Sequence, residues 1–125
     1  MWKQYNENPL GKRVGDCSVR SVSKALDIPW DTAYTRLTLQ GYVMGDMPSS
    51  NAVIAALLKQ NGFKRGIVPD ACQDCYTLEE FAAENPHGTY VVFMDKHVAT
   101  IVDGVIWDAW DSSKEYPLFY FYKEA

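Results

Sequence analysis

The sequence predicts an α+β fold, with helices in the first half of the chain and strands in the last third. In the first half, apolar residues recur every three or four positions, which is the spacing of one face of a helix. In the last third, β-branched and aromatic runs are separated by turn residues, which is typical of an antiparallel meander. Helices followed by strands, without regular alternation, favour α+β architecture.

Three helices are expected over residues 16–26, 31–40 and 48–60. Each begins at polar residues that favour a helix N-terminus, namely Asp16, Asp31 and the Ser49-Ser50 pair. The residues expected to end them are Ile28-Pro29, Gly41 and Asn61-Gly62. The apolar residues expected to face the core are Val19, Val22, Ala25, Leu26, Ala33, Leu37, Val53, Ile54, Leu57 and Leu58, with Tyr34 as a further candidate.

The rest of the chain predicts one more helix and several strands. Residues 63–68 are expected to form a short strand and residues 69–76 a loop. The sequence Thr77-Leu78-Glu79-Glu80 is a capping box, which predicts a helix that ends near Glu84. The later strands are expected at residues 90–94, 97–102, 105–110 and 118–122.

Length and composition are those of one ordinary globular domain. The 125 residues are enough to bury a core without disulfides, and we expect a single domain over residues 1–125. Hydrophobic residues make up 47% and charged residues 22%, which argues against a disordered or membrane-spanning chain. The formal net charge is -4 and no basic run exceeds Lys12-Arg13, so nucleic acid is not an expected partner.

The termini and cysteines indicate a cytoplasmic protein. Residues 1–6 contain no apolar signal-peptide core. Three cysteines argue against a disulfide framework, and leave at least one free thiol. Cys72 and Cys75 could bind zinc with His87 or form a reversible disulfide, but a structural zinc site needs four ligands and no second pair is present. We therefore expect no metal and no cofactor.

Cys17 is the first candidate for chemistry, because it follows a Gly-Asp pair at the start of the first predicted helix. The free backbone N–H groups and the dipole of a helix N-terminus stabilise an anion by roughly 0.3–1 kcal/mol. That effect is small, and a reactive thiolate also needs a cationic imidazole beside it. A histidine must therefore lie close to Cys17 if the thiol is a nucleophile.

His97 can be placed by counting strand register from the hairpin signal Asp103-Gly104. With these two residues as the loop, Val102 pairs with Val105, and His97 and Asp108 become diagonal neighbours on one side of the sheet. Asp108 can then accept a hydrogen bond from one ring nitrogen of His97 and leave the other nitrogen free to face a thiol.

The order of Cys17 on an early helix, His97 on a strand and Asp108 on the next strand resembles that of papain-like cysteine peptidases. The similar segments are residues 8–11 (NPLG), 15–20 (GDCSVR) and 97–112 (HVATIVDGVIWDAWDS), which look like those of small papain-like proteins of bacteria and their phages, including bacteriocin-processing peptidases. The resemblance implies a papain-like fold, with N-terminal helices packed on a C-terminal antiparallel sheet, in a bacterial or phage-infected cell.

The resemblance also implies the roles of the three residues. Cys17 would be the nucleophile, His97 its base and Asp108 the residue that orients the imidazole, acting on a peptide or protein substrate as a peptidase, isopeptidase or amidase. Papain-like enzymes usually carry a Gln several residues before the nucleophile, and this chain departs from that pattern. Asn8 or Gln4 could donate to the oxyanion if the loop folds back, as could a cation of Lys12-Arg13.

Other interpretations use the same residues. The fold could serve as a catalytically inactive module that binds a protein or peptide, and a thiol-dependent acyl transferase would use the same triad. Cys17 could be a buried structural thiol, His97 a backbone-bonded residue at a strand end and Asp108 a solvated strand residue. Arg20 either orients Asp16 or a substrate carboxylate, or lies on the helix surface.

Overall fold

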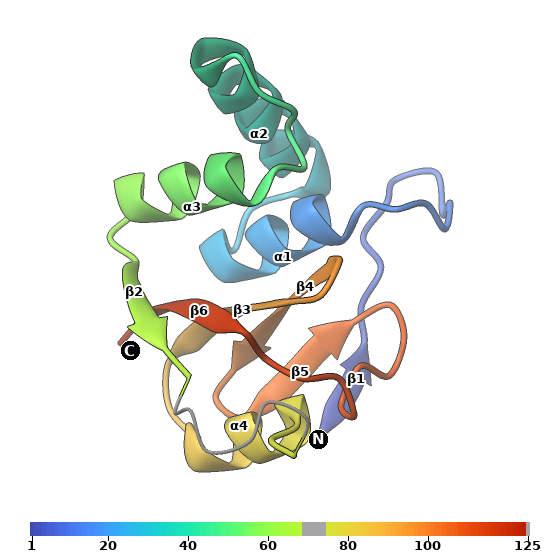
Figure 1. Cartoon of the computed structure of the whole chain (residues 1–125). Helices are drawn as coiled ribbons and strands as arrows, with labels where there is room; N and C mark the ends of the chain where they lie inside the picture. Colours follow the sequence, from blue (N-terminus) through green and yellow to red (C-terminus); the bar gives the residue numbers. More distant parts are fainter. Residues whose placement is uncertain (69–74, 125) are drawn as a thin grey trace.

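The computed structural model describes residues 1–68 and 75–124. This part of the chain forms an α+β fold with four helices and a six-stranded sheet (Figure 1). In chain order the elements are β1 (Trp2–Gln4), α1 (Cys17–Leu26), α2 (Trp30–Met44), α3 (Asn51–Gln60), β2 (Lys64–Ile67), α4 (Leu78–Glu84), β3 (Thr89–Met94), β4 (His97–Val102), β5 (Val105–Asp108) and β6 (Phe119–Lys123).

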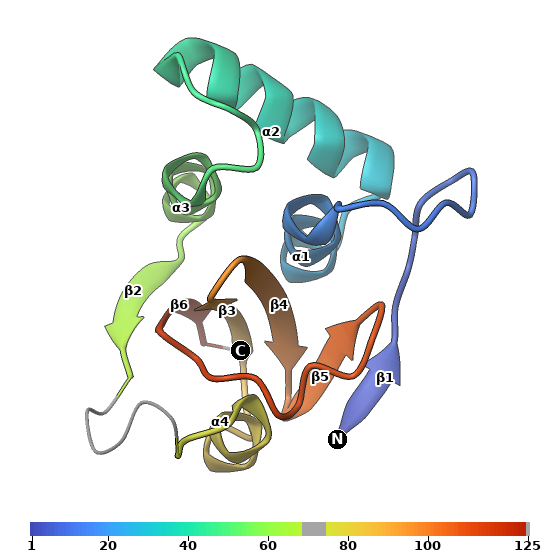
Figure 2. The same cartoon turned by 45° about the vertical axis from the view of Figure 1, so that its right-hand side comes forward.

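The sheet lies between two helical layers, with α1, α2 and α3 on one side and α4 on the other (Figure 2). Strand β3 shows why, because its side chains alternate between the two faces. Val91 and Phe93 pack into the core under α1–α3, whereas Val92 and Met94 pack into the core with α4. All four side chains are buried, so this strand is covered on both faces.

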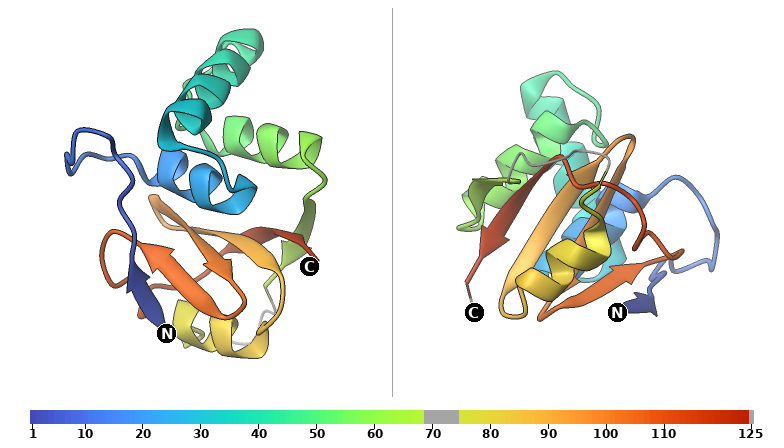
Figure 3. Two further views of the ribbon diagram at one scale, coloured as in Figure 1. Left: turned by 180° about the vertical axis from the view of Figure 1, so that it is seen from behind. Right: turned by 60° about the horizontal axis from the view of Figure 1, so that its bottom comes forward.

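The strand order is β1-β5-β4-β3-β6-β2, and the sheet is mixed. The C-terminal strands β3 to β6 pair antiparallel, as predicted. The prediction is wrong for the sheet as a whole, because β1 joins its edge in parallel to β5. β2, which follows the helices, pairs antiparallel with β6 at the other edge. Figure 3 shows β1 beside β5, far in sequence but adjacent in space. Sequence analysis missed β1 because three residues carry no periodic signal.

The hairpin between β4 and β5 has the predicted register. Val102 pairs with Val105 and Thr100 with Trp107, as counted from the sequence. Both loop residues have positive φ, 49° at Asp103 and 80° at Gly104, as a two-residue type I′ turn requires. The predicted strand pairing is therefore confirmed.

The predicted helices are confirmed, with two corrections. α2 continues to Met44 and ends at Gly45, whose φ of 67° is the left-handed conformation of a C-cap. Gly41 lies inside this helix, where the missing side chain leaves space for the backbone of residues 46–48. Tyr34, a candidate for the core, is 52% exposed and stacks on Trp30.

Capping is confirmed at α3 and α4 and differs at α1 and α2. The N-cap of α2 is Pro29, and Asp31, the predicted cap, lies in the first turn of the helix. Ser50 accepts the backbone N–H of Ala52, and Thr77 and Glu80 form the predicted capping box. Asp16 occupies the N-cap position of α1 but makes no side-chain capping hydrogen bond. Its carboxylate is bound elsewhere, as described below. No helix in the described ranges is both long and apolar enough to cross a bilayer.

Candidate active site

Helix α1 and the β4–β5 hairpin, which are far apart in the sequence, bring Cys17, His97 and Asp108 together. Cys17 is the first residue of α1, His97 is the first residue of β4 and Asp108 is the last residue of β5. Helix α1 lies over β4, where the Oγ of Ser21 donates to the carbonyl of Val98 at 3.0 Å. The N-terminus of α1 therefore meets the end of the β4–β5 hairpin that carries the histidine and the acid.

His97 and Asp108 form a short buried hydrogen bond. The Nε2 atom of His97 lies 2.6 Å from Oδ2 of Asp108, and the two side chains are 9% and 1% exposed. Since Nε2 is occupied by the carboxylate, Nδ1 is the ring nitrogen that remains for the thiol. The indole of Trp110 packs against the imidazole, with 4.7 Å between the ring centroids. Asp108 and Trp110 therefore fix the orientation of the imidazole ring.

The thiol of Cys17 is half-buried and interacts with His97 and with the backbone N–H of Val98. Burial raises the pKa of this thiol, but hydrogen bonds from His97 and Val98 and the charges of His97 and Arg20 lower it by more. The pKa of Cys17 therefore lies below its ordinary value. Such a thiol carries more of the nucleophilic thiolate at neutral pH than a free cysteine does.

The histidine and the acid shift in the complementary directions. Burial lowers the pKa of His97, but its hydrogen bonds with Asp108 and Cys17 raise it to about 9. Burial raises the pKa of Asp108, which the hydrogen bonds from His97, Ser112 and Ala109 hold below its ordinary value. The site thus favours an imidazolium between a thiolate and a carboxylate.

Each carboxylate oxygen of Asp108 accepts hydrogen bonds from two donors. The Oγ of Ser112 donates to Oδ2 at 2.7 Å, and the backbone N–H of Ala109 donates to Oδ1 at 2.8 Å. The Nη2 atom of Arg20 also donates to Oδ1, at 3.1 Å. A carboxylate with four donors cannot rotate without breaking several hydrogen bonds, so Oδ2 stays directed at His97.

Arg20 and Asp16 extend this network into the helical layer. Nη1 of Arg20 forms an ion pair with Oδ1 of Asp16, one helical turn before it. The indole Nε1 of Trp30, the first residue of α2, donates to the other oxygen of Asp16 at 2.9 Å. Asp16 and Arg20 are each 6% exposed, so the interpretation of Arg20 as a surface residue is wrong. Orientation of Asp16 by Arg20 is confirmed, and it explains why Asp16 does not cap α1.

A cavity of about 320 Å³ opens over the thiol and the imidazole. It is lined by Asn6, Arg13, Val14, Gly15, Asp16, Cys17, Arg20, Lys96, His97, Ala109 and Trp110. One wall comes from the segment between β1 and α1, residues 5–16, and the other from the ends of β4 and β5. A small group bound here would lie against both Cys17 and His97.

The segment before α1 supplies Asn6 to this cavity, whereas Gln4 and Asn8 are not among its lining residues. Gln4 is exposed on β1, and the side-chain oxygen of Asn8 accepts the backbone N–H of Leu10 at 2.9 Å. The side-chain amide of Asn6 donates to the carbonyl of Lys12 at 3.3 Å, and its nitrogen carries a second proton. Asn6, rather than Gln4 or Asn8, is therefore the side-chain amide that lines the cavity.

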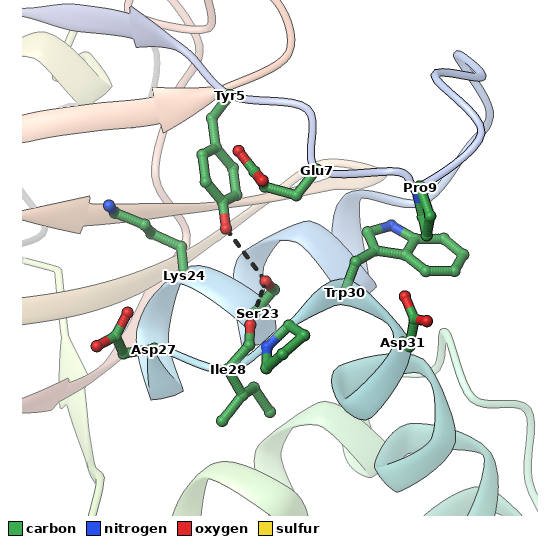
Figure 4. Close-up of a pocket in the computed structure, with 10 residues that line it drawn as sticks. Tyr5, Glu7, Pro9, Ser23, Lys24, Asp27, Ile28, Trp30 and Asp31 are labelled. Atoms are coloured by element: carbon green, nitrogen blue, oxygen red, sulfur yellow. Dashed lines mark hydrogen bonds between the residues drawn. The ribbon is translucent and has the colours of Figure 1, made fainter.

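A second cavity, of about 410 Å³, is lined by Trp30 and by residues of α1 and the N-terminal segment (Figure 4). There the hydroxyl of Tyr5 hydrogen-bonds to Ser23 of α1 at 3.1 Å. The contact ties residues 5–15 to the helix that carries Cys17, and Pro9 of the same segment lies beside the Trp30 indole. This cavity is lined by Tyr5, Glu7, Pro9, Ser23, Lys24, Asp27, Ile28, Pro29, Trp30 and Asp31, without Cys17 or His97.

The zinc and disulfide interpretations of the Cys72-Cys75 pair involve a segment, residues 69–74, that is outside the described residues. Cys75 itself is exposed, at the start of the described part that follows. Within residues 1–68 and 75–124, no group of three or more His, Cys, Asp or Glu side chains is placed to hold a metal ion.

Sequence analysis did not assign Trp30, Ser112, Trp110 or Asn6 to the site, and it gave the orientation of Asp16 by Arg20 as one of several interpretations. The spacing of Asp16 and Arg20, four residues apart at a helix start, was a usable signal, because such pairs lie on one helix face. Ser112 and Trp110 lie within four residues of Asp108, so the chain itself keeps them near the site. Trp30 and Asn6 are brought in by contacts between distant segments, for which no local pattern exists. No protein-family model, curated protein or solved structure matches this chain.

Proposed function

We propose that this chain is a cysteine-nucleophile hydrolase with a papain-like fold, which cleaves an amide, isopeptide or thioester bond of a peptide or protein. The observation that carries the proposal is that one imidazole contacts both a half-buried thiol and a buried carboxylate, in a cavity open to a small group. A structural cysteine needs neither a charged partner nor an accessible cavity.

Catalysis would proceed through an acyl-enzyme. The thiolate of Cys17 attacks the carbonyl carbon and forms a C–S bond, while the carbonyl electrons move to oxygen. The tetrahedral intermediate collapses, and His97 gives its proton to the leaving amine or thiol. A water molecule then attacks the thioester, His97 takes the proton of that water, and the carboxylic acid product leaves as the thiol is regenerated. Asp108 holds the imidazole in the orientation that both steps need.

The backbone N–H of Cys17 and the side chain of Asn6 are the candidate oxyanion donors. Cys17 is the first residue of α1, where N–H groups have no acceptor within the helix. Asn6 lies on the same cavity from the facing segment. Removal of one such donor typically lowers turnover by about 10²–10³-fold, whereas binding changes little.

The test is the pH profile of Cys17 alkylation by iodoacetamide, with the label located by peptide mapping. We expect rapid labelling at pH 6 in the wild type, since only a thiol of low pKa is reactive there. His97→Ala should lose this labelling because the imidazolium is removed. The chain offers a matched control, since its other histidine, His87, is exposed in a turn and His87→Ala should leave the profile unchanged.

The two outcomes separate enzyme from binding module. Low-pH labelling that depends on His97 justifies a search with peptide, isopeptide and thioester substrates, whose products also distinguish a hydrolase from an acyl transferase. Labelling that follows an ordinary thiol titration in both proteins contradicts the proposal. The fold would then be a catalytically inactive module that binds a protein or peptide.

A further inference from the structure

Two exposed cations line the cavity over Cys17 and define its mouth. Arg13 lies on the segment before α1, and Lys96 lies in the turn between β3 and β4. Both residues are exposed, and neither makes an ion pair with any residue in the described ranges. The acidic groups of the same cavity are already bound, Asp16 by Arg20 and Trp30. The free charge at the mouth is therefore positive.

This positive mouth contrasts with the chain as a whole, whose formal net charge is -4. A cleft whose sign opposes that of the whole molecule selects ligands, because the local potential attracts anions that the remaining surface repels. Trp110 and Val14 add apolar surface to the same cavity. A ligand that fits has an apolar portion and one negative charge.

Lys96 has a backbone conformation that is unusual for a lysine. Lys96 has a φ of 56°, in the left-handed region that favours glycine, asparagine or aspartate over lysine. A glycine would fit this turn with less strain. The turn directly precedes His97, so the strained conformation sets a lysine at the cavity wall next to the imidazole.

We propose that the site selects acyl substrates that carry a carboxylate next to the carbonyl under attack, bound by Arg13 and Lys96. The inference rests on the proposed function, since it takes Cys17 as the nucleophile. A guanidinium from one wall and an ammonium from the other can both donate to one carboxylate, and the planar guanidinium matches it with two parallel hydrogen bonds. The carboxylate could be the C-terminus of a peptide or an Asp or Glu side chain.

The test compares two alkylating reagents that differ by the charge in question. Iodoacetate carries a carboxylate on the carbon that the thiolate attacks, and iodoacetamide carries a neutral amide there. The ratio of their rates at Cys17, divided by the same ratio for free N-acetylcysteine, measures the preference for an anion. Because both reagents react with one thiolate, changes in the pKa of Cys17 cancel in the ratio.

We expect the normalised ratio to exceed one in the wild type and to fall by about threefold or more in Arg13→Gln/Lys96→Gln, as steering by two charges predicts. Lys96→Arg should preserve it, and 0.5 M salt should reduce it. Arg36→Gln on α2 and Lys64→Gln on β2 are matched controls, since both remove an exposed cation away from this cavity and should leave the ratio unchanged.

The imidazolium of His97 attracts anions in every protein of the series. The proposal is therefore tested by comparing the variants with the wild type, and not by the wild-type ratio alone. If iodoacetamide labels Cys17 at low pH but the double variant keeps the wild-type ratio, the inference fails and the proposed function stands. If neither reagent labels Cys17 at pH 6, the proposed function itself fails.

Protection of Cys17 from iodoacetamide identifies the source of the carboxylate. N-acetylglycylglycine presents a C-terminal carboxylate, N-acetylglutamate methylamide presents a side-chain carboxylate, and N-acetylglycine methylamide is the neutral control. Stronger protection by either acid than by the neutral compound supports the proposal and names the source. Equal protection by all three contradicts it.

Discussion

The guanidinium of Arg20 lies between two buried carboxylates, those of Asp16 and Asp108. Its charge compensates groups that burial would otherwise disfavour, and it lowers the pKa of Cys17. Trp30 completes the network by donating to Asp16. Arg20 is therefore a positioning residue, since it acts on the reacting atoms through Asp108 and His97.

Arg20→Met should lower the free energy of unfolding by about 3–5 kcal/mol, because it leaves two buried carboxylates without their cation. It should also move the alkylation profile of Cys17 to higher pH, which a loss of packing alone would not do. Urea unfolding and iodoacetamide labelling measure the two effects. Arg20→Lys should recover part of the profile, since it keeps the charge but loses the forked geometry.

Arg36→Met is the control for this prediction, because Arg36 is exposed on α2 and forms no ion pair within the described residues. Its stability and its alkylation profile should match the wild type. An Arg20→Met protein with wild-type labelling at pH 6 would show that Arg20 serves stability alone.

At the scale of elements, the packing of α2 depends on one position without a side chain. A Cβ added at Gly41 would lie 2.7 Å from the backbone oxygen of Asp46 and 3.2 Å from the nitrogen of Pro48. Gly41 is buried in the last turn of the helix, where its low helix propensity is a cost of up to about 1 kcal/mol relative to alanine. Close packing of the loop after α2 outweighs that cost.

Gly41→Ala should therefore destabilise the protein by about 1–3 kcal/mol, despite the higher helix propensity of alanine, because backbone atoms must move to admit the methyl group. Thermal unfolding measures the change. Thr38→Ala, at an exposed position of the same helix, is the control and should be close to neutral. A stabilised Gly41→Ala protein would mean that the loop adjusts freely.

The elements of the fold also differ in how far neighbouring residues in the chain determine their geometry. The capping box at Thr77 and Glu80 and the Asp103-Gly104 turn depend on a few neighbouring residues, and both have the geometry predicted from the sequence. The end of α2 does not, because Gly41 is a normal stop signal that tertiary packing overrides, and the helix ends at Gly45.

At the scale of the whole molecule, stability is coupled to the protonation of His97. The pKa of His97 is raised in the folded protein, so its contribution to stability is fully present below the unfolded pKa of about 6.5 and is lost as pH rises through the folded value. Cys17 titrates in the opposite sense, because its folded pKa is lowered. The two contributions must be separated to be measured.

A Cys17→Ser background removes the thiol while His97 keeps its hydrogen bond to Asp108. In this background, the difference in free energy of unfolding between His97 and His97→Gln should be largest below pH 6.5 and should decline as pH rises toward about 9. The part of the difference that depends on protonation should be lost before that pH, because the contribution of the thiol to the raised pKa is absent. Urea unfolding at several pH values measures it. The same comparison at His87 is the control, and a constant difference at His97 would contradict an imidazolium held by Asp108.

Local patterns were sufficient to predict the helices, the later strands, the register of the β4–β5 hairpin and, through that register, the proximity of His97 and Asp108. These features follow from helical and strand periodicity, caps and turns, which depend on residues close together in the chain. The three-dimensional structure was needed to show that β1 adds in parallel at the sheet edge, that Arg20 is buried against Asp108, and that Asn6 rather than Asn8 or Gln4 lines the cavity. Each of these depends on packing between segments far apart in sequence, and such contacts leave no local pattern to read.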